Sequence, residues 1–244
     1  MNAPAALAHE AIYDTVEAIL RDRPRGRLLD APAGQGALAL RLKAAGFDVL
    51  CCDLYPEIFK LDEIENRRGD LDARLPFDDA SFDYVVCVEG LEHIENPANA
   101  IREFSRLLVS GGQLIVSVPN ILNIEERLKW LFSGYTSHFK PLSETARKQI
   151  ENEFGGMEEI ALHVNPIGYA ELRYHLEKSG FVVKEVHLDK PKKNIWAFLP
   201  LAVVIRAASK FSSVEKRRGR WSDELNSNEV LLGGNTLIFS ARKV

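Results

Sequence analysis

The chain is poor in cysteine and in long apolar runs, and each shortage excludes a class of protein. Its 244 residues hold three cysteines, Cys51, Cys52 and Cys87, at a spacing that fits no zinc site. All three lie in strand-like apolar runs, which indicates buried free thiols and a reducing, cytoplasmic location. No run approaches the ~18 uninterrupted apolar residues of a membrane span, and the beginning of the chain has no signal-peptide pattern.

A basic excess is missing as well, because 31 Lys and Arg stand against 35 Asp and Glu, for a net charge of −4. Proteins that bind nucleic acids generally carry a clear positive excess, so we expect no nucleic-acid partner. The apolar share of 46% and the charged share of 27% are those of an ordinary globular protein. With no repeat and no low-complexity linker, residues 1–244 are expected to form a single domain.

Strand-like and helix-like patterns alternate along most of the chain. Apolar runs predict strands at 27–30, 47–52, 67–71, 84–88, 113–118, 181–188 and 236–241. Helical spacing predicts helices at 9–21, 37–45, 97–108, 124–132 and 166–178. The order indicates an α/β fold with a doubly wound, mostly parallel seven-stranded sheet. Two less regular stretches, about 120–165 and 190–234, are expected to form an inserted helical cap.

The stretch from Arg27 to Ala39 combines a strand, a tight turn and a helix start. The strand ends in Asp30, and Gly34 and Gly36 follow before the helix begins. Such a turn lets backbone N–H groups approach a ligand closely. The positions of Gly34, Gly36 and Ala39 also fit the dinucleotide-binding pattern, so the turn alone leaves an NAD-dependent oxidoreductase open.

Three acids, Asp30, Asp53 and Asp70, follow three successive strand positions. The carboxyl ends of parallel strands share one edge, so Asp30, Asp53 and Glu89 are expected to converge on a ligand there. Asp53 can accept hydrogen bonds from ribose hydroxyls, and Asp70 can accept one from the amine of adenine. Asp30 would repel a pyrophosphate but tolerates a cationic sulfonium, which favours S-adenosylmethionine as the cofactor.

The segment from Arg27 to Pro119 resembles the class I S-adenosylmethionine-dependent methyltransferases. Residues 30–36, Asp-Ala-Pro-Ala-Gly-Gln-Gly, are similar to the family's first motif, with Pro32 in place of its first glycine. The stretches 75–83 and 89–93 are similar to its middle motifs, in a manner that resembles the quinone and glycan-cluster O-methyltransferases. The resemblance implies a Rossmann-like fold and a set of cofactor-binding residues: Asp30, Ala31, Gly34, Gly36, Asp53, Leu54, Asp70, Leu71, Val88 and Glu89.

The resemblance also implies methyl transfer to a small-molecule acceptor, which we expect to occur at oxygen. His93 is the predicted catalytic residue because imidazole titrates near neutral pH, and His138 and His163 are further candidates. Glu89, Glu92 and His93 resemble a triplet of the quinone O-methyltransferases, some of which use a metal. We assign no metal here, and a non-catalytic cofactor-binding protein remains an alternative.

An apolar segment, residues 195–205, has basic residues on both sides. Lys190, Lys192 and Lys193 precede it, and the Lys and Arg residues between 206 and 220 follow it. Such a segment can lie on an anionic membrane surface. It also resembles segments of methyltransferases that accompany cell-surface glycan assembly, and this resemblance implies a lipid-linked or glycan acceptor. A lid helix over the active site, with solvated charges beyond it, explains the same pattern, and we prefer that interpretation.

Overall fold

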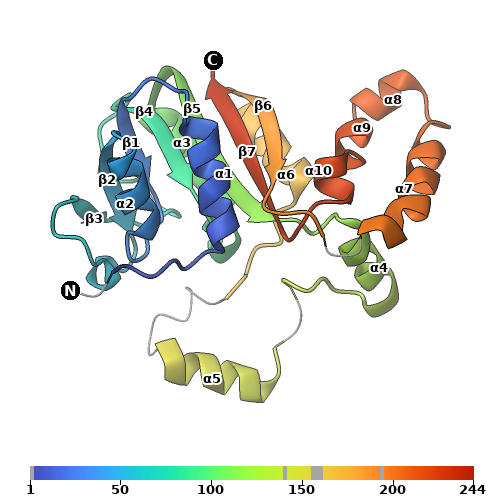
Figure 1. The fold of residues 1–244 in the computed structure, drawn as a ribbon, viewed down its shortest axis with the longest axis horizontal. Coiled ribbons are helices and arrows are strands. Elements are labelled where there is room, and N and C mark those ends of the chain that lie inside the picture. Colours follow the sequence, from blue (N-terminus) through green and yellow to red (C-terminus); the bar gives the residue numbers. More distant parts are fainter. Residues whose placement is uncertain (1–2, 140–141, 155–161, 193–194) are drawn as a thin grey trace.

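The computed structural model describes residues 3–139, 142–154, 162–192 and 195–244 (Figure 1). A seven-stranded sheet crosses it in the order β3-β2-β1-β4-β5-β7-β6. The strands are β1 Arg27–Asp30, β2 Asp48–Asp53, β3 Asn66–Arg68, β4 Phe82–Cys87, β5 Leu108–Pro119, β6 Phe181–Leu188 and β7 Thr236–Lys243. β1 to β5 pair in parallel, and β7 runs antiparallel between β5 and β6. The expected doubly wound, mostly parallel sheet is confirmed.

Helices cover both faces of the sheet. α1 (Glu10–Leu20) and α2 (Ala37–Ala44) lie on the near face in Figure 1, and α3 (Pro97–Leu107) and α6 (Tyr169–Lys178) lie on the far face. The sequence explains α3 locally, because Asn96 caps it through the N–H of Asn99 and Pro97 occupies its first turn. The large apolar side chains of α3, Ile101, Phe104 and Leu107, recur at helical spacing and are buried in the core.

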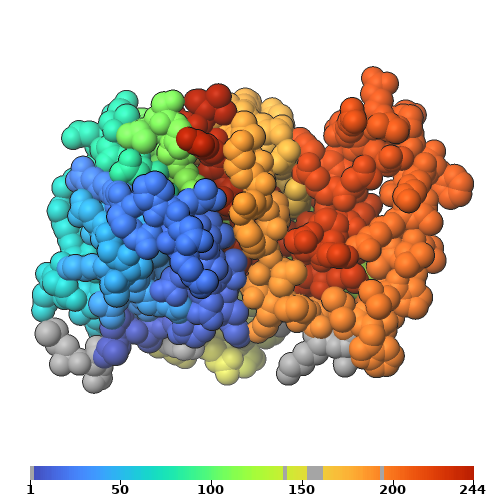
Figure 2. Space-filling view, turned by 45° about the horizontal axis from the view of Figure 1, so that its top comes forward, coloured from blue at the N-terminus to red at the C-terminus, as the bar shows by residue number. Residues whose placement is uncertain are grey.

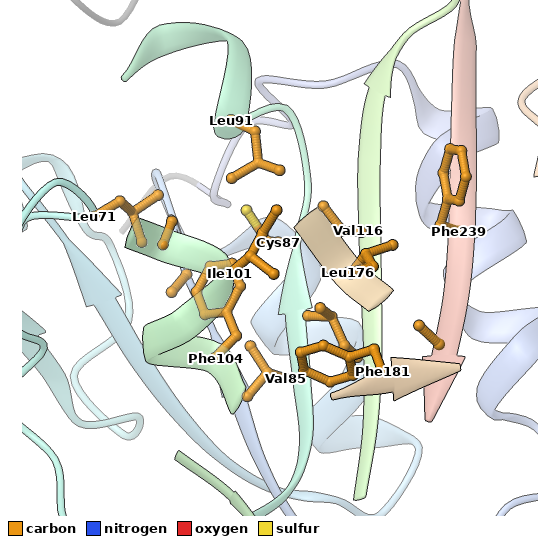
Figure 3. Packing of buried hydrophobic residues seen from close by; sticks show 14 of the residues in the cluster. Leu71, Val85, Cys87, Leu91, Ile101, Phe104, Val116, Leu176, Phe181 and Phe239 are labelled. Atoms are coloured by element: carbon orange, nitrogen blue, oxygen red, sulfur yellow. The ribbon is translucent and has the colours of Figure 1, made fainter. Parts of the chain in front are cut away.

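The hydrophobic core is split by the sheet into two layers. Figure 3 shows part of the larger layer, where Val85, Cys87 and Val116 of the central strands meet Ile101 and Phe104 of α3. The three cysteines are buried and unpaired with one another, as expected. The two apolar faces of the central strands explain why these strands read as nearly continuous apolar runs.

Some element boundaries differ from the expected ones. β3 ends at Arg68 rather than at residue 71, so Asp70 and Leu71 follow the strand instead of belonging to it. β4 begins and ends slightly earlier than predicted. β5 begins at Leu108 rather than at residue 113. The strand continues through Gly111, which has φ +78°, and its register shifts against β4 there.

The two irregular stretches hold more helix than expected. They contain α4 Ile124–Ser133, α5 Glu144–Phe154, α7 Ile195–Ser209, α8 Val214–Arg218, α9 Ser222–Leu225 and α10 Asn228–Leu231. α5 lies below the carboxyl ends of the parallel strands in Figure 1, whereas α7, α8 and α9 project sideways beyond β6 in Figures 1 and 2. α4, α7 and α10 share a small apolar cluster that includes Ile124, Ala202 and Leu231.

Within the described ranges, no helix combines the length and the apolar character that crossing a bilayer requires. The cytoplasmic location and the single-domain organisation stay predictions.

The packing of α3 allows a direct test of the core. Phe104 is fully buried and Phe132 is 82% exposed. We expect Phe104→Ala to lower the free energy of unfolding by about 3–5 kcal/mol, because it removes buried apolar area and leaves a cavity. The matched change Phe132→Ala should have an effect within about 0.5 kcal/mol. Urea unfolding of both variants measures the difference, and similar losses for the two would contradict this packing.

Candidate active site

The carboxyl ends of β1, β2, β3 and β4 open into one pocket, as the strand order requires. Most of the residues singled out in the sequence line it: Asp30, Gly34, Asp53, Leu54, Asp70, Leu71, Val88, Glu89 and His93. Ala31 and Gly36 belong to the same turn but do not line the pocket wall. The strand topology therefore brings residues from four separate chain segments to one place.

Asp30 is the most deeply buried acid of the pocket, with 1% of its surface exposed. Burial and the nearby Asp53 carboxylate raise the pKa of Asp30 to about 8, and a hydrogen bond from the backbone N–H of Ala39 offsets part of this rise. Its Oδ2 atom has no hydrogen-bond partner among the described residues. A buried carboxylate oxygen without a partner fits a cationic ligand group.

Asp53 ties the end of β2 to the glycine turn. One carboxylate oxygen accepts the N–H of Gly34 at 2.8 Å, and the other accepts the N–H of Tyr55 at 2.9 Å. Burial raises the pKa of Asp53, and these two bonds act in the opposite direction. A carboxylate has about four acceptor positions, so each oxygen can accept a second donor such as a ribose hydroxyl.

The two glycines of the turn are required by conformation and by space. Gly34 and Gly36 have φ of +53° and +91°, values that side chains disfavour. A Cβ atom at Gly34 would lie 2.7 Å from Leu7 Cδ1, and one at Gly36 would lie 2.7 Å from Phe59 Cε2. The backbone of the turn is thus packed closely beneath the N-terminal segment and the loop after β2.

Asp70 occupies the exposed rim of the pocket just after β3. Its Oδ1 accepts the N–H of Asp72 at 2.8 Å, which stabilises the turn there. The neighbouring Leu71 is buried and contributes to the core. Asp70 therefore has a local structural role in addition to the adenine contact that the sequence predicts.

Glu89 follows β4 and is held by a serine of β5 that the sequence analysis did not single out. The Glu89 N–H donates to Ser117 Oγ at 2.8 Å, and Ser117 Oγ donates to Glu89 Oε1 at 3.1 Å. Glu89 has φ +48°, an uncommon value for a residue with a side chain. Such backbone conformations persist only where the surroundings enforce them, which Ser117 does here.

Glu92 lies fully buried in η2 (Leu91–His93), and neither of its carboxylate oxygens has a hydrogen-bond partner in the described part of the chain. Burial and the neighbouring Glu89 carboxyl raise the pKa of Glu92 well above its usual value. Burial is also the main reason why the pKa of Glu89 is raised. Burial and the closeness of the two carboxyls therefore act in the same direction and favour the protonated form of Glu92.

Three histidines that are distant in sequence meet beside the pocket. The rings of His93 and His163 lie 4.8 Å apart, and those of His138 and His163 lie 5.8 Å apart. His93 Nδ1 lies 2.9 Å from the carbonyl oxygen of Leu162 and must donate to it, because a carbonyl only accepts. Burial, together with the two other histidines, lowers the pKa of His163 to about 4.

One ligand atom each from Glu92, His93 and His163 lie within 4.8 Å of one another. A carboxylate with two imidazoles could hold a divalent metal, and this set differs from the triplet Glu89, Glu92 and His93 discussed above. The assignment of no metal stays a prediction.

The N-terminal segment also contributes to the pocket, through Leu7, Ala8 and Tyr13. Burial and the nearby Asp30 raise the pKa of Tyr13 to about 12, so its hydroxyl is neutral at physiological pH. Tyr13 lies within the predicted helix 9–21, where a pocket residue and a core residue cannot be told apart from the sequence. The described residues of 120–165 and 190–234 do not line this pocket, although His163 contacts His93 at its edge. The cap assignment stays a prediction.

Comparison with known proteins gives related results at three levels. A family model described as a methyltransferase domain matches residues 29–116. The chain is 27% identical over 187 residues to a ubiquinone biosynthesis O-methyltransferase of Psychrobacter cryohalolentis, an alignment that covers 68% of this chain and 72% of that one. It is 34% identical over 112 residues to a demethylmenaquinone methyltransferase of Renibacterium salmoninarum, covering 43% and 45%. The chain thus spans less than half the length of the second relative.

The solved structure of an S-adenosylmethionine-dependent methyltransferase from Mesorhizobium loti superimposes with a TM-score of 0.56 at 18% identity. The superposition covers 98% of this chain and 100% of that one. At 18% sequence identity, the structural similarity shows only that the two proteins share a fold.

The buried Asp30 should make stability depend on pH. Because its pKa lies above the usual 3.8, at about 8, the folded chain loses stability as pH rises through that window. Asp30→Asn removes this loss. We therefore expect the melting temperature of the variant, relative to that of the unsubstituted protein, to increase as the pH is raised from about 4 to about 8. Melting curves of both proteins without ligand measure the difference. A difference that stays constant over this range would contradict the burial of an unpaired Asp30.

Proposed function

Because the chain is a class I S-adenosylmethionine-dependent methyltransferase, we propose that it methylates a hydroxyl oxygen of a small aromatic acceptor. The family implies S-adenosylmethionine as the methyl donor. We therefore prefer a methyltransferase to the NAD-dependent oxidoreductase and to the non-catalytic cofactor-binding protein. One observation carries the proposal: a histidine suited to accept a proton stands in the wall of the same pocket as the carboxylates that fit a cationic nucleoside.

The donor site is proposed from residues already in the pocket wall. Asp53 would accept the ribose hydroxyls, and Asp70 with the backbone of Leu71 would bind the adenine. Asp30 would accept a hydrogen bond from the amino group of the methionine part at Oδ2, which has no partner among the described residues. Gly34 lines the pocket beside these groups, with its backbone close to the side chain of Leu7. The residues present therefore fit the donor.

The chemical demands on the protein are modest. S-adenosylmethionine, when bound, supplies a methyl group on a cationic sulfur that is already a good leaving group. The residues then have to align the acceptor oxygen and exclude water. A hydroxyl acceptor must also lose its proton, which requires a base within reach.

His93 is the proposed base. Its Nδ1–H is fixed on the carbonyl of Leu162, so the lone pair of the neutral ring lies on Nε2. The neighbouring His163 has a lowered pKa and is neutral near pH 7, so it adds no positive charge that would oppose protonation of His93. The proton from the acceptor would pass to His93 Nε2 and then to water.

The surroundings of His93 favour an aromatic acceptor. Ile94 lines the pocket, and the ring of Phe139 lies 5.7 Å from that of His163. Rings and apolar side chains at this spacing contribute to binding of a flat acceptor. The two relatives are named as a ubiquinone biosynthesis O-methyltransferase and a demethylmenaquinone methyltransferase, and both names refer to quinones, which supports this choice.

Asp53 tests the donor site. We expect Asp53→Ala to weaken adenosylhomocysteine binding by about 1.5–3 kcal/mol, because hydrogen bonds to a charged acceptor are lost. Isothermal titration calorimetry measures the dissociation constant. Asp62→Ala, an exposed acid in the following loop that does not line the pocket, is the control. An unchanged affinity of the Asp53 variant would refute the ribose assignment.

His93 tests the chemistry. We expect His93→Gln to lower kcat for a catechol-type acceptor by about 10²–10⁴-fold, while the dissociation constant for adenosylhomocysteine stays within a factor of about two. Single-turnover assays over a pH series also show whether the variant loses the pH dependence that a catalytic base gives to the methyl-transfer rate. His187→Gln, outside the pocket, is the control. Full activity of the His93 variant would mean that alignment alone carries the reaction.

A further inference from the structure

The helix α7 has an outer face without a single polar side chain. Among its fifteen residues only Arg206 and Ser209 are polar, and both are half-buried on the inner side. The outer face carries the large side chains of Trp196 (71% exposed), Leu199, Val203 and Val204. A helix that is apolar all round is normally buried on every side, whereas α7 buries one face.

The inner face of α7 is already occupied. Ile195, Phe198, Leu201, Ala202 and Ile205 belong to the apolar cluster with α4 and α10. Arg206 is fixed to the carbonyl of Asn226 and the side chain of Asn228. The orientation of α7 is therefore set by packing, and none of its residues lines the pocket. The lid interpretation of this segment stays a prediction. In Figure 2 this segment projects at the edge of the molecule.

Basic side chains are concentrated around α7. Residues 190–220 hold nine Lys or Arg and one acid, Glu215, which leaves 22 basic and 34 acidic side chains in the remainder of the chain. Lys193 lies outside the described residues. Five of the nine are exposed and form no ion pair with any described carboxylate: Lys190, Lys210, Lys216, Arg218 and Arg220. An acidic protein thus carries one strongly cationic segment.

Further large apolar side chains are exposed just after α7 and at the end of α4. Phe211, just after α7, is 94% exposed. Trp130, Leu131 and Phe132 end α4, the helix whose first turn packs against α7. Their exposed fractions are 61%, 71% and 82%. Exposed apolar groups of this size mark interaction sites rather than ordinary surface.

From these observations we infer that the outer face of α7 docks on an anionic phospholipid surface. Apolar side chains would enter the interface while the unpaired cations contact the lipid phosphates. The fifteen residues of α7 span about 22 Å, less than the ~30 Å hydrocarbon layer, so the helix would lie along the surface. The inference concerns a surface apart from the methyl-transfer site and does not depend on the proposed acceptor.

A second copy of the chain fits this surface less well. A two-fold interface brings the same patch of each copy together, which would place the cationic segments of both copies side by side. Like charges in such an interface are unfavourable, whereas an anionic surface neutralises them.

Vesicle binding tests the inference with the whole protein. We expect co-sedimentation with vesicles of phosphatidylcholine and phosphatidylglycerol at low salt, little binding to phosphatidylcholine alone, and release at high salt. The fluorescence of Trp196 should shift to shorter wavelength on the anionic vesicles, and Trp196→Phe should remove most of the shift. No sedimentation with anionic vesicles at low salt would overturn the inference.

Two variants separate the apolar and the charged contributions. Replacing Trp196, Val203 and Phe211 by Ser should weaken vesicle binding at least about tenfold. Replacing Lys210, Lys216, Arg218 and Arg220 by Gln should weaken it on the order of 100-fold or more.

The control replaces four exposed basic residues elsewhere by Gln: Arg21, Arg102, Lys178 and Lys184. Equal losses in the control and in the α7 variant would contradict a specific surface, as would a dimer in light scattering that the apolar variant converts to a monomer. Circular dichroism of all variants confirms that they are folded, and cofactor binding should be unchanged because none of the altered residues lines the pocket.

Discussion

The burial of the Asp30 carboxyl at the end of β1 is the constraint on which the site depends. A carboxylate in this position loses its hydration, and one oxygen has no partner among the described residues to compensate. The result is a raised pKa and a pocket that prefers a cationic ligand group. The fold retains an arrangement that costs stability, as functional sites commonly do. The surrounding turn is arranged around it, with Gly34 held by the Asp53 carboxylate.

The fold and the donor side of the site follow from local sequence patterns. Alternating strand and helix signals fix the parallel sheet, and the sheet brings the ends of β1, β2 and β4 to one edge. Asp30, Asp53 and Glu89 could be recognised because each lies at the end of a strand or within two residues of it. The sequence pattern alone therefore indicated their position in space. The positions of these three acids follow from the strands alone, without knowledge of the loops that connect the strands.

Other parts of the site depend on contacts that local patterns do not encode. His163 contacts His93, and His138 contacts His163, from two stretches without a clear period. Ser117 is one more residue inside an apolar strand. α5 has few apolar residues and gave no helical signal. For α7 the difficulty is the opposite, because a helix that is apolar on all sides gives no indication of which face is buried. Only packing against α4 and α10 determines it.

The most direct measurement of the central claim is a crystal structure of the protein with adenosylhomocysteine. The account expects the amino group of the ligand within hydrogen-bond distance of Asp30 Oδ2, the ribose hydroxyls on Asp53 and the adenine beside Asp70. A ligand bound elsewhere, or one in the pocket whose amino group does not contact Asp30, would contradict it.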